Sequence, residues 1–217
     1  MRIVAKIILF TISLNGLFAQ SGEFIDSLKA VTSNSIIVLE DNCIGCIVMD
    51  SPCETYSNSG NPKNKYVIWK NEKGYHIKKF NVCGGSKTVN FKKWKNDPFG
   101  IISSRSMEID TTSLKYPLSL NRKDSTWFET GINHYKYYHF QFLTDSISEI
   151  TIKDYAFREK NEEDDVWELT DVEFQKNRSR YEFNNSTAIK ELLDCLISAF
   201  NKNYKQLKVI PIKGINH

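Results

Sequence analysis

Two segments of the chain carry apolar residues at helical spacing. The first predicts a short helix over about 22–32, and its apolar positions are Phe24, Ile25, Leu28 and Val31. The second predicts a longer helix over about 187–203, with Ser186 or Thr187 as a natural cap. Its apolar stripe comprises Ile189, Leu192, Leu193, Leu196 and Phe200.

Alternating apolar and polar positions, which are typical of β-strands, flank a reversal between Trp69 and Tyr75. The intervening sequence Asn71-Glu72-Lys73-Gly74 favours a tight turn, because glycine readily adopts positive φ angles. This pattern predicts a hairpin over about 65–82.

A second hairpin is predicted over about 134–155. On its first strand, one face carries Tyr138, Phe140 and Phe142, and the other carries Tyr135, Tyr137, His139 and Gln141. Such alternation indicates an antiparallel sheet with one buried face and one wetter face.

Weaker patterns predict further strands. They lie at Ser35–Glu40, continuing in the same character over Cys43–Met49, and at Lys87–Phe91, Ile101-Ile102, Val166–Val172 and Leu207–Ile212. Strands grouped in hairpins, with a helix near each end of the chain, predict an α+β fold built on an antiparallel sheet.

The first 19 residues have the pattern of an export signal. Arg2 and Lys6 precede an apolar run of about a dozen residues, and Ala19 precedes the expected cut before Gln20. The run is too short to span a bilayer, which takes about 20 residues. The sequence therefore predicts that residues 1–19 are removed, and that residues 20–217 form a single globular α+β domain that is secreted or periplasmic, without membrane insertion.

Removal of the signal changes the charge of the chain. The full sequence has 29 basic and 26 acidic residues, a net charge of +3. Arg2 and Lys6 leave with the signal, so the mature chain has 27 basic residues against 26 acidic ones, a net charge of +1. A near-neutral chain argues against nucleic acid as a partner, since phosphate binding needs a basic surface.

Cysteines are concentrated in one part of the chain. Cys43, Cys46, Cys53 and Cys83 lie close together in sequence, while Cys195 stands apart. Export favours structural disulfides among the four, and the sequence leaves all three pairings open. For Cys195 we expect a buried free thiol, with an intermolecular bond as the alternative.

Two other interpretations of the cysteines compete with structural disulfides. The Cys43-Ile44-Gly45-Cys46 spacing would suit a redox-active dithiol, although no helical pattern follows it. A zinc site of four thiolates would show two close pairs, whereas this sequence has one, at Cys43 and Cys46.

No recognisable catalytic, phosphate-binding, cofactor or metal motif occurs in the sequence, so we expect no cofactor and no metal. Tyr135, Tyr137 and His139 form a candidate binding row on the wetter face of the second hairpin. The resulting hypothesis is an exported, disulfide-stabilised, non-catalytic domain that binds a protein or glycan partner. The alternative is a thiol–disulfide oxidoreductase using Cys43 and Cys46, and a third, weaker class is a hydrolase with a dispersed site.

Three N-glycan acceptor patterns also occur, beginning at Asn177, Asn184 and Asn185. They have a consequence only if the host glycosylates exported proteins.

Overall fold

A computed structural model describes residues 20–30, 35–44, 64–81, 83–129, 135–143, 149–157 and 171–211. Residues 1–19, with the predicted signal, lie outside these ranges, so signal removal stays a prediction. Cys46 and Cys53 also lie outside them.

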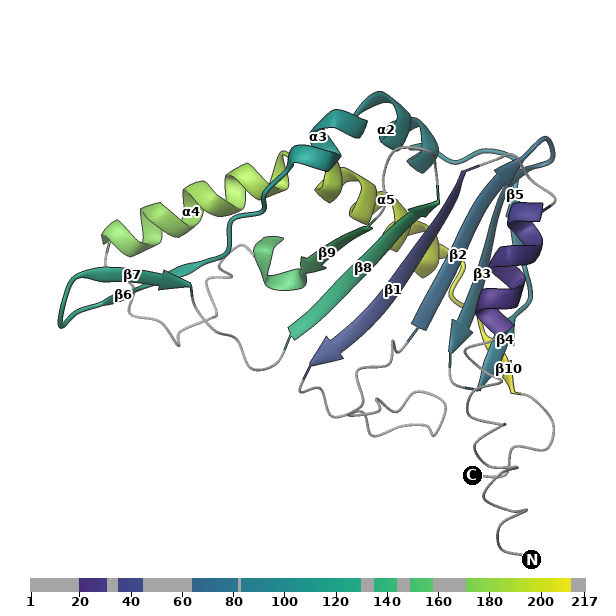
Figure 1. Ribbon diagram of the computed structural model, residues 1–217, viewed down its shortest axis with the longest axis horizontal. Coiled ribbons are helices and arrows are strands. Elements are labelled where there is room, and N and C mark those ends of the chain that lie inside the picture. The colour runs from purple at the N-terminus through teal and green to yellow at the C-terminus, as the bar shows by residue number, and fades with distance from the viewer. Residues whose placement is uncertain are drawn as a thin grey trace, which may run out of the picture.

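An antiparallel sheet forms the centre of the described structure (Figure 1). Its strands are β1 (Ile36–Ile44), β2 (Asn64–Asn71), β3 (Gly74–Asn81), β4 (Gly84–Ser86), β5 (Val89–Phe91), β8 (Tyr135–Leu143), β9 (Glu149–Lys153) and β10 (Val209–Pro211). The order across the sheet is β10-β4-β3-β2-β1-β8-β9, and β5 also pairs with β3. A separate hairpin consists of β6 (Leu118–Asn121) and β7 (Thr126–Glu129).

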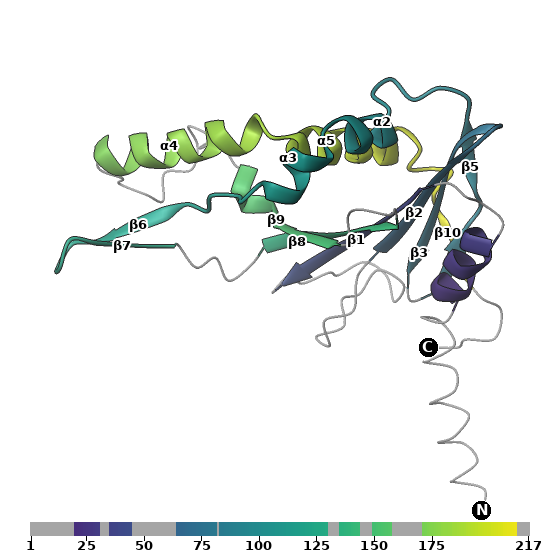
Figure 2. The same ribbon diagram turned by 45° about the horizontal axis from the view of Figure 1, so that its top comes forward.

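Helices cover both faces of this sheet (Figure 2). On one face lie α2 (Pro98–Ser104), α3 (Ser106–Thr111) and α5 (Ala188–Lys202), while α4 (Asp171–Asn185) extends beyond the end of the sheet. On the other face lies an N-terminal helix, described over 20–30. The α+β class, both long hairpins and the helices near the two ends of the chain are thus confirmed.

Two apolar cores result from this arrangement. The larger core lies under α2, α3 and α5, where the helical stripe of α5 meets inward-facing residues of the sheet such as Ile37, Phe140 and Ile152. The smaller core lies under the N-terminal helix, where Ile25 meets Val67. Strand β1 contributes alternate residues to each core, as the period of two in a strand requires.

The turn of the first hairpin requires glycine. Gly74 has a φ angle of 124°, which L side chains rarely adopt. A Cβ atom at this position would also lie 2.6 Å from the carbonyl oxygen of Phe91 on the neighbouring strand β5. The predicted turn is therefore confirmed, and contact with β5 adds a second reason for glycine.

One predicted short strand is wrong, and a second is wrong at the two positions that the structure describes. Ile101 and Ile102 lie in α2 rather than in a strand, because Pro98 begins a helix that Asp97 caps by accepting a hydrogen bond from the Phe99 amide at 3.0 Å. Val172 lies in α4, and the rest of the strand predicted over Val166–Val172 falls outside the described residues, except Asp171, which is also helical.

Helix α4 and the β6–β7 hairpin form an arm that extends from one end of the sheet (Figure 1). The buried side chains of α4 that face the hairpin are polar: Glu173, Asn177 and Asn184. They bind the backbone of an extended segment. Asn177 accepts from the Leu118 amide at 2.9 Å and donates to the Leu118 carbonyl at 3.0 Å.

Further hydrogen bonds from α4 follow along the same extended segment, and together they form a ladder. Asn184 exchanges two hydrogen bonds with the Lys115 backbone, and Glu173 accepts one from the Leu120 amide. The helix and the extended segment match in length between these contacts. The eleven residue steps from Glu173 to Asn184 rise about 16.5 Å at 1.5 Å each. The five extended steps from Lys115 to Leu120 also span about 16.5 Å at 3.3 Å each. The ladder protects an edge of β6 that would otherwise be unpaired.

Candidate functional site

The three residues of the predicted binding row lie side by side on β8, on the face of the sheet opposite to the one that α5 covers. Tyr135, Tyr137 and His139 are all half-buried. The ring centroids of Tyr135 and Tyr137 are 6.4 Å apart. His139 Nδ1 lies 2.9 Å from Thr151 Oγ1 on the neighbouring strand, and its Nε2 lies 3.8 Å from a Glu149 oxygen.

A cation completes this row, which the sequence pattern alone did not indicate. The Lys153 ammonium lies 4.9 Å from the ring centroid of Tyr116, 5.7 Å from that of Tyr155 and 5.8 Å from that of Tyr135. A hydrogen bond with the Tyr155 side chain raises the pKa of Lys153. Cation–π contacts between the ammonium and the three rings stabilise this cluster.

A pocket of about 510 Å³ lies elsewhere, between residues 89–96 and one side of α5. Its volume is within the range of small-molecule binding sites. Its lining comprises Val89, Asn90, Phe91, Lys93, Trp94, Lys95, Asn96, Asp194, Cys195, Ser198, Ala199, Lys202, Asn203 and Gln206. No histidine lines it, so His139 and this pocket belong to separate parts of the molecule.

Aromatic packing fixes one wall of the pocket. The Trp94 ring makes edge contacts with Phe91, at a centroid distance of 4.9 Å, and with Tyr75, at 5.7 Å. Such contacts hold a ring in one orientation. Trp94 is nevertheless only half-buried, so it can offer a flat apolar surface to a ligand.

Cys195 forms an inert part of the lining. It is the free cysteine among the described residues and is buried. Its thiol donates a hydrogen bond to the Asn96 carbonyl at 2.7 Å. Burial raises the pKa of Cys195 to about 12, so the thiol is protonated at neutral pH and is a poor nucleophile. The predicted burial of Cys195 is confirmed, and its free thiol, rather than an intermolecular bond, stays a prediction.

Amides and lysines supply the polar part of the pocket. Asn90 and Asn203 are held in place, since Asn90 Oδ1 lies 2.6 Å from His76 Nδ1 and Asn203 Nδ2 donates to the Ala199 carbonyl. The side chains of Asn96 and Gln206 are exposed. Amides that both donate and accept suit hydroxyl-rich ligands.

The two described cysteines of the predicted disulfide set lie at one end of the sheet. Cys43 is the penultimate residue of β1, and Cys83 follows β3, which runs parallel to β1 because both are antiparallel to β2. Cys43 is therefore in a strand, without the helix N-terminus that lowers thiol pKa values in redox-active dithiols.

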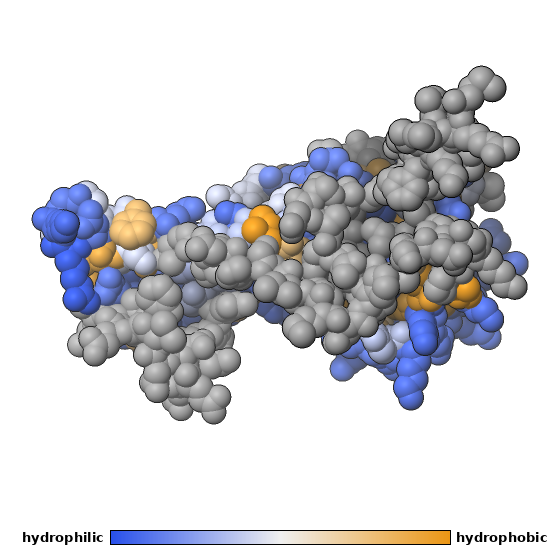
Figure 3. Space-filling model, turned by 90° about the horizontal axis from the view of Figure 1, so that it is seen from below, coloured by the Kyte–Doolittle hydropathy of each residue, from blue (hydrophilic) through white to orange (hydrophobic). Residues whose placement is uncertain are grey.

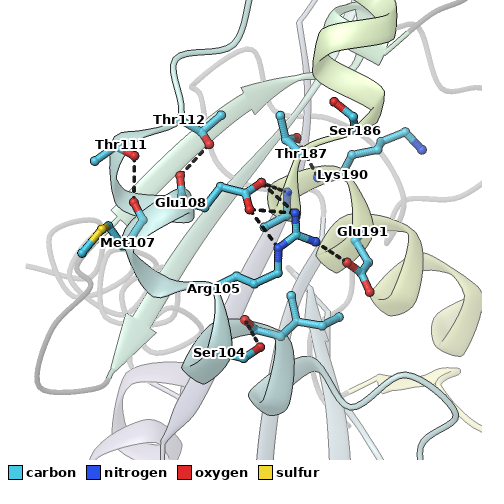
Figure 4. A network of polar contacts seen from close by, with 12 residues as sticks. Ser104, Arg105, Met107, Glu108, Thr111, Thr112, Ser186, Thr187, Lys190 and Glu191 are labelled. Carbon is cyan, nitrogen blue, oxygen red and sulfur yellow. Dashed lines mark hydrogen bonds and ion pairs between the residues drawn. The ribbon is translucent and has the colours of Figure 1, made fainter.

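A further polar network joins α3 to α5 and is structural (Figure 4). The Arg105 guanidinium contacts Glu108 through Nε and Nη2, and Glu191 through Nη1. Glu108 in turn accepts a hydrogen bond from the Ala188 amide at 2.6 Å. The carboxylate thus caps the N-terminus of α5, and its contacts leave little of the network for a ligand.

Two of the glycan acceptor patterns fall on structural asparagines. Asn177 and Asn184 are buried and hydrogen-bonded to backbone groups of residues 115–118. Neither amide is available for modification in the folded protein.

Metal-ligand clusters and membrane-spanning helices are both absent from the residues that the structure describes. Within those ranges, no three His, Cys, Asp or Glu side chains gather as metal ligands. None of the helices described there is both long and apolar enough to cross a membrane.

Compared with protein-family models, curated proteins and solved structures, the chain has no match.

Proposed function

We propose that this chain is an exported, disulfide-stabilised domain that acts without catalysis by binding a protein or glycan partner. The observation that carries the proposal is the pocket beside α5. It combines a fixed, half-buried Trp94 with exposed amides, and it holds no activated nucleophile, because its thiol is buried and protonated.

Of the two kinds of partner, the pocket favours a glycan. Aromatic rings stack on the C–H faces of sugars, and amide side chains bond sugar hydroxyls as donors and as acceptors. A protein partner would need a broader apolar area. In the view from below, the visible described residues are mainly hydrophilic, with hydrophobic ones in small separate spots (Figure 3).

The alternative function, thiol–disulfide exchange by Cys43 and Cys46, remains a separate hypothesis. The position of Cys43 in β1 gives it no support, because a strand offers no helix dipole to stabilise a thiolate.

A saccharide panel tests the proposal. We expect the mature chain to bind at least one oligosaccharide in isothermal titration calorimetry, and the double variant Asn96→Ala/Gln206→Ala to bind it about thirtyfold more weakly, through loss of two hydrogen bonds of about 1 kcal/mol each. Gln175→Ala/Asn201→Ala is the matched control, since both side chains are exposed and lie outside the pocket. Chemical turnover of the bound sugar, or equal weakening by both double variants, would contradict the proposal.

A further inference from the structure

Resting on the proposed glycan-binding function, we infer that the ligand of the pocket is an anionic saccharide, a sugar that carries a carboxylate or a sulfate. The inference comes from the charges around the pocket, which differ from those of the chain as a whole.

Three lysines line the pocket: Lys93, Lys95 and Lys202. All three are exposed, and none has a carboxylate at salt-bridge distance within the part of the chain that the structure describes. The pocket has one acidic residue, Asp194, and the Lys190 ammonium already neutralises it with contacts of 2.5 and 2.6 Å. The pocket is therefore strongly cationic in a mature chain of nearly balanced charge.

A lysine directly beside the pocket does have an acidic partner, since Lys70 pairs with Asp97 at 3.0 Å. Among the described residues, Lys93 and Lys95, on the loop that carries Trp94, have no such partner. Concentrated, uncompensated cations around a concave site favour anionic ligands through focused electrostatic attraction.

The three lysines differ in what else stabilises them. Lys202 lies in the last turn of α5, where the negative end of the helix dipole already favours a cation. Lys93 and Lys95 lie on a loop and have no such compensation. A ligand anion placed near Trp94 would therefore gain more from the loop lysines than from Lys202.

Calorimetry with defined probes tests this inference on the full mature chain. The anionic probes are tetragalacturonate, which carries carboxylates, and a heparin-derived tetrasaccharide, which also carries sulfates. The neutral probe is cellotetraose, and AMP represents a different anionic class. We expect at least one anionic sugar to bind tenfold or more tightly than the neutral sugar at 20 mM salt, and this preference to shrink severalfold at 300 mM, because salt screens exposed charges.

Two double variants locate the effect. Lys93→Gln/Lys95→Gln should weaken anionic sugar binding about tenfold and leave neutral sugar binding unchanged, and Lys202→Gln should have a smaller effect. Lys73→Gln/Lys123→Gln removes the same charge from exposed positions outside the pocket and should leave both unchanged.

The outcomes separate this inference from the proposed function. Equal, salt-insensitive binding of neutral and anionic sugars overturns the anionic preference but keeps the glycan-binding function. Binding of no sugar overturns both, and binding of AMP alone overturns the saccharide class. Equal weakening by the two lysine double variants would mean a non-specific polyanion effect and overturns the inference.

Discussion

At the scale of single residues, Asn184 is the most tightly held polar group in the arm. Its side chain has no exposed surface. It accepts a hydrogen bond from the Lys115 amide and donates to the carbonyls of Lys115 and Ala156, at 2.6 Å each. One amide group thus joins α4, the segment before β6 and the short helix after β9.

Replacing this residue should be costly. We expect Asn184→Ala to lower the free energy of unfolding by about 3 kcal/mol, because three backbone groups lose their partner at about 1 kcal/mol each. This is the lower end of the usual cost, since only the bond to the Ala156 carbonyl is fully buried. Urea denaturation followed by circular dichroism measures the change. Asn201→Ala, at an exposed position on α5, is the control and should stay within about 0.5 kcal/mol of the unaltered protein.

At the scale of elements, the helices differ in how far the sequence could predict them. The stripe of α5 is a regular 3.6-residue pattern, and its five predicted positions are all buried. Helix α4 has the opposite arrangement: its buried positions are polar, whereas Val172, Phe174 and Phe183 are exposed. Periodicity of apolar residues could not predict it, since tertiary hydrogen bonds rather than apolar burial fix its buried face.

The start of α5 provides a test that depends on pH. The Ala188 amide and, with it, the Arg105 guanidinium hold the pKa of Glu108 below its usual value. A carboxyl with a lowered pKa in the folded state stabilises the protein above its unfolded pKa, near 4.5, and this contribution is lost as pH falls through the folded pKa.

We therefore expect Glu108→Gln to lower stability by about 1 kcal/mol at pH 7, a modest figure because the side chain is 40% exposed and screened by solvent. The difference from the unaltered protein should vanish in acid. Urea midpoints measured from pH 7 to pH 2 give both curves. Glu182→Gln removes a carboxylate from an exposed pair with Arg178 and serves as the control; a similar pH-dependent loss in it would rule out the cap as the cause.

At the scale of the whole molecule, the sheet brings Cys43 and Cys83 to one end. Asp41 pairs with Asn64 in β2, and the register between β2 and β3 places Asn81 next in the same row. Cys43 lies two residues further along β1, and Cys83 lies in the turn between Asn81 of β3 and its partner Gly84 of β4, on the side of β3 away from β2. Two strand spacings of roughly 4.8 Å separate such positions by about 10 Å, beyond the roughly 7 Å that a disulfide spans.

We accordingly expect Cys43 and Cys83 to pair with Cys46 and Cys53 rather than with each other. Non-reducing peptide mass mapping of the exported protein should find two bonds, each joining one residue of the first pair to one of the second, and a mature chain that begins at Gln20. A direct Cys43–Cys83 bond would contradict the register argument, and a chain that retains residues 1–19 would contradict the export signal.

The two candidate binding regions also differ in how far the sequence could predict them. Tyr135, Tyr137 and His139 share a face because a strand alternates, so their proximity follows from local pattern alone. The pocket joins residues 89–96 to residues 194–206, about one hundred positions later. Only the packing of α5 over the sheet brings these segments together, and no local pattern contains that information.

The ladder between α4 and the segment before β6 has a kinetic consequence. Its hydrogen bonds join residues 53 to 69 positions apart, whereas helix α4 and the β6–β7 hairpin each form from local contacts. Closing a chain loop of that length costs entropy before any of the bonds is made. We therefore expect the arm to dock late in folding and to open first near the unfolding transition, with the Leu118 and Leu120 amides exchanging with solvent before those of β1.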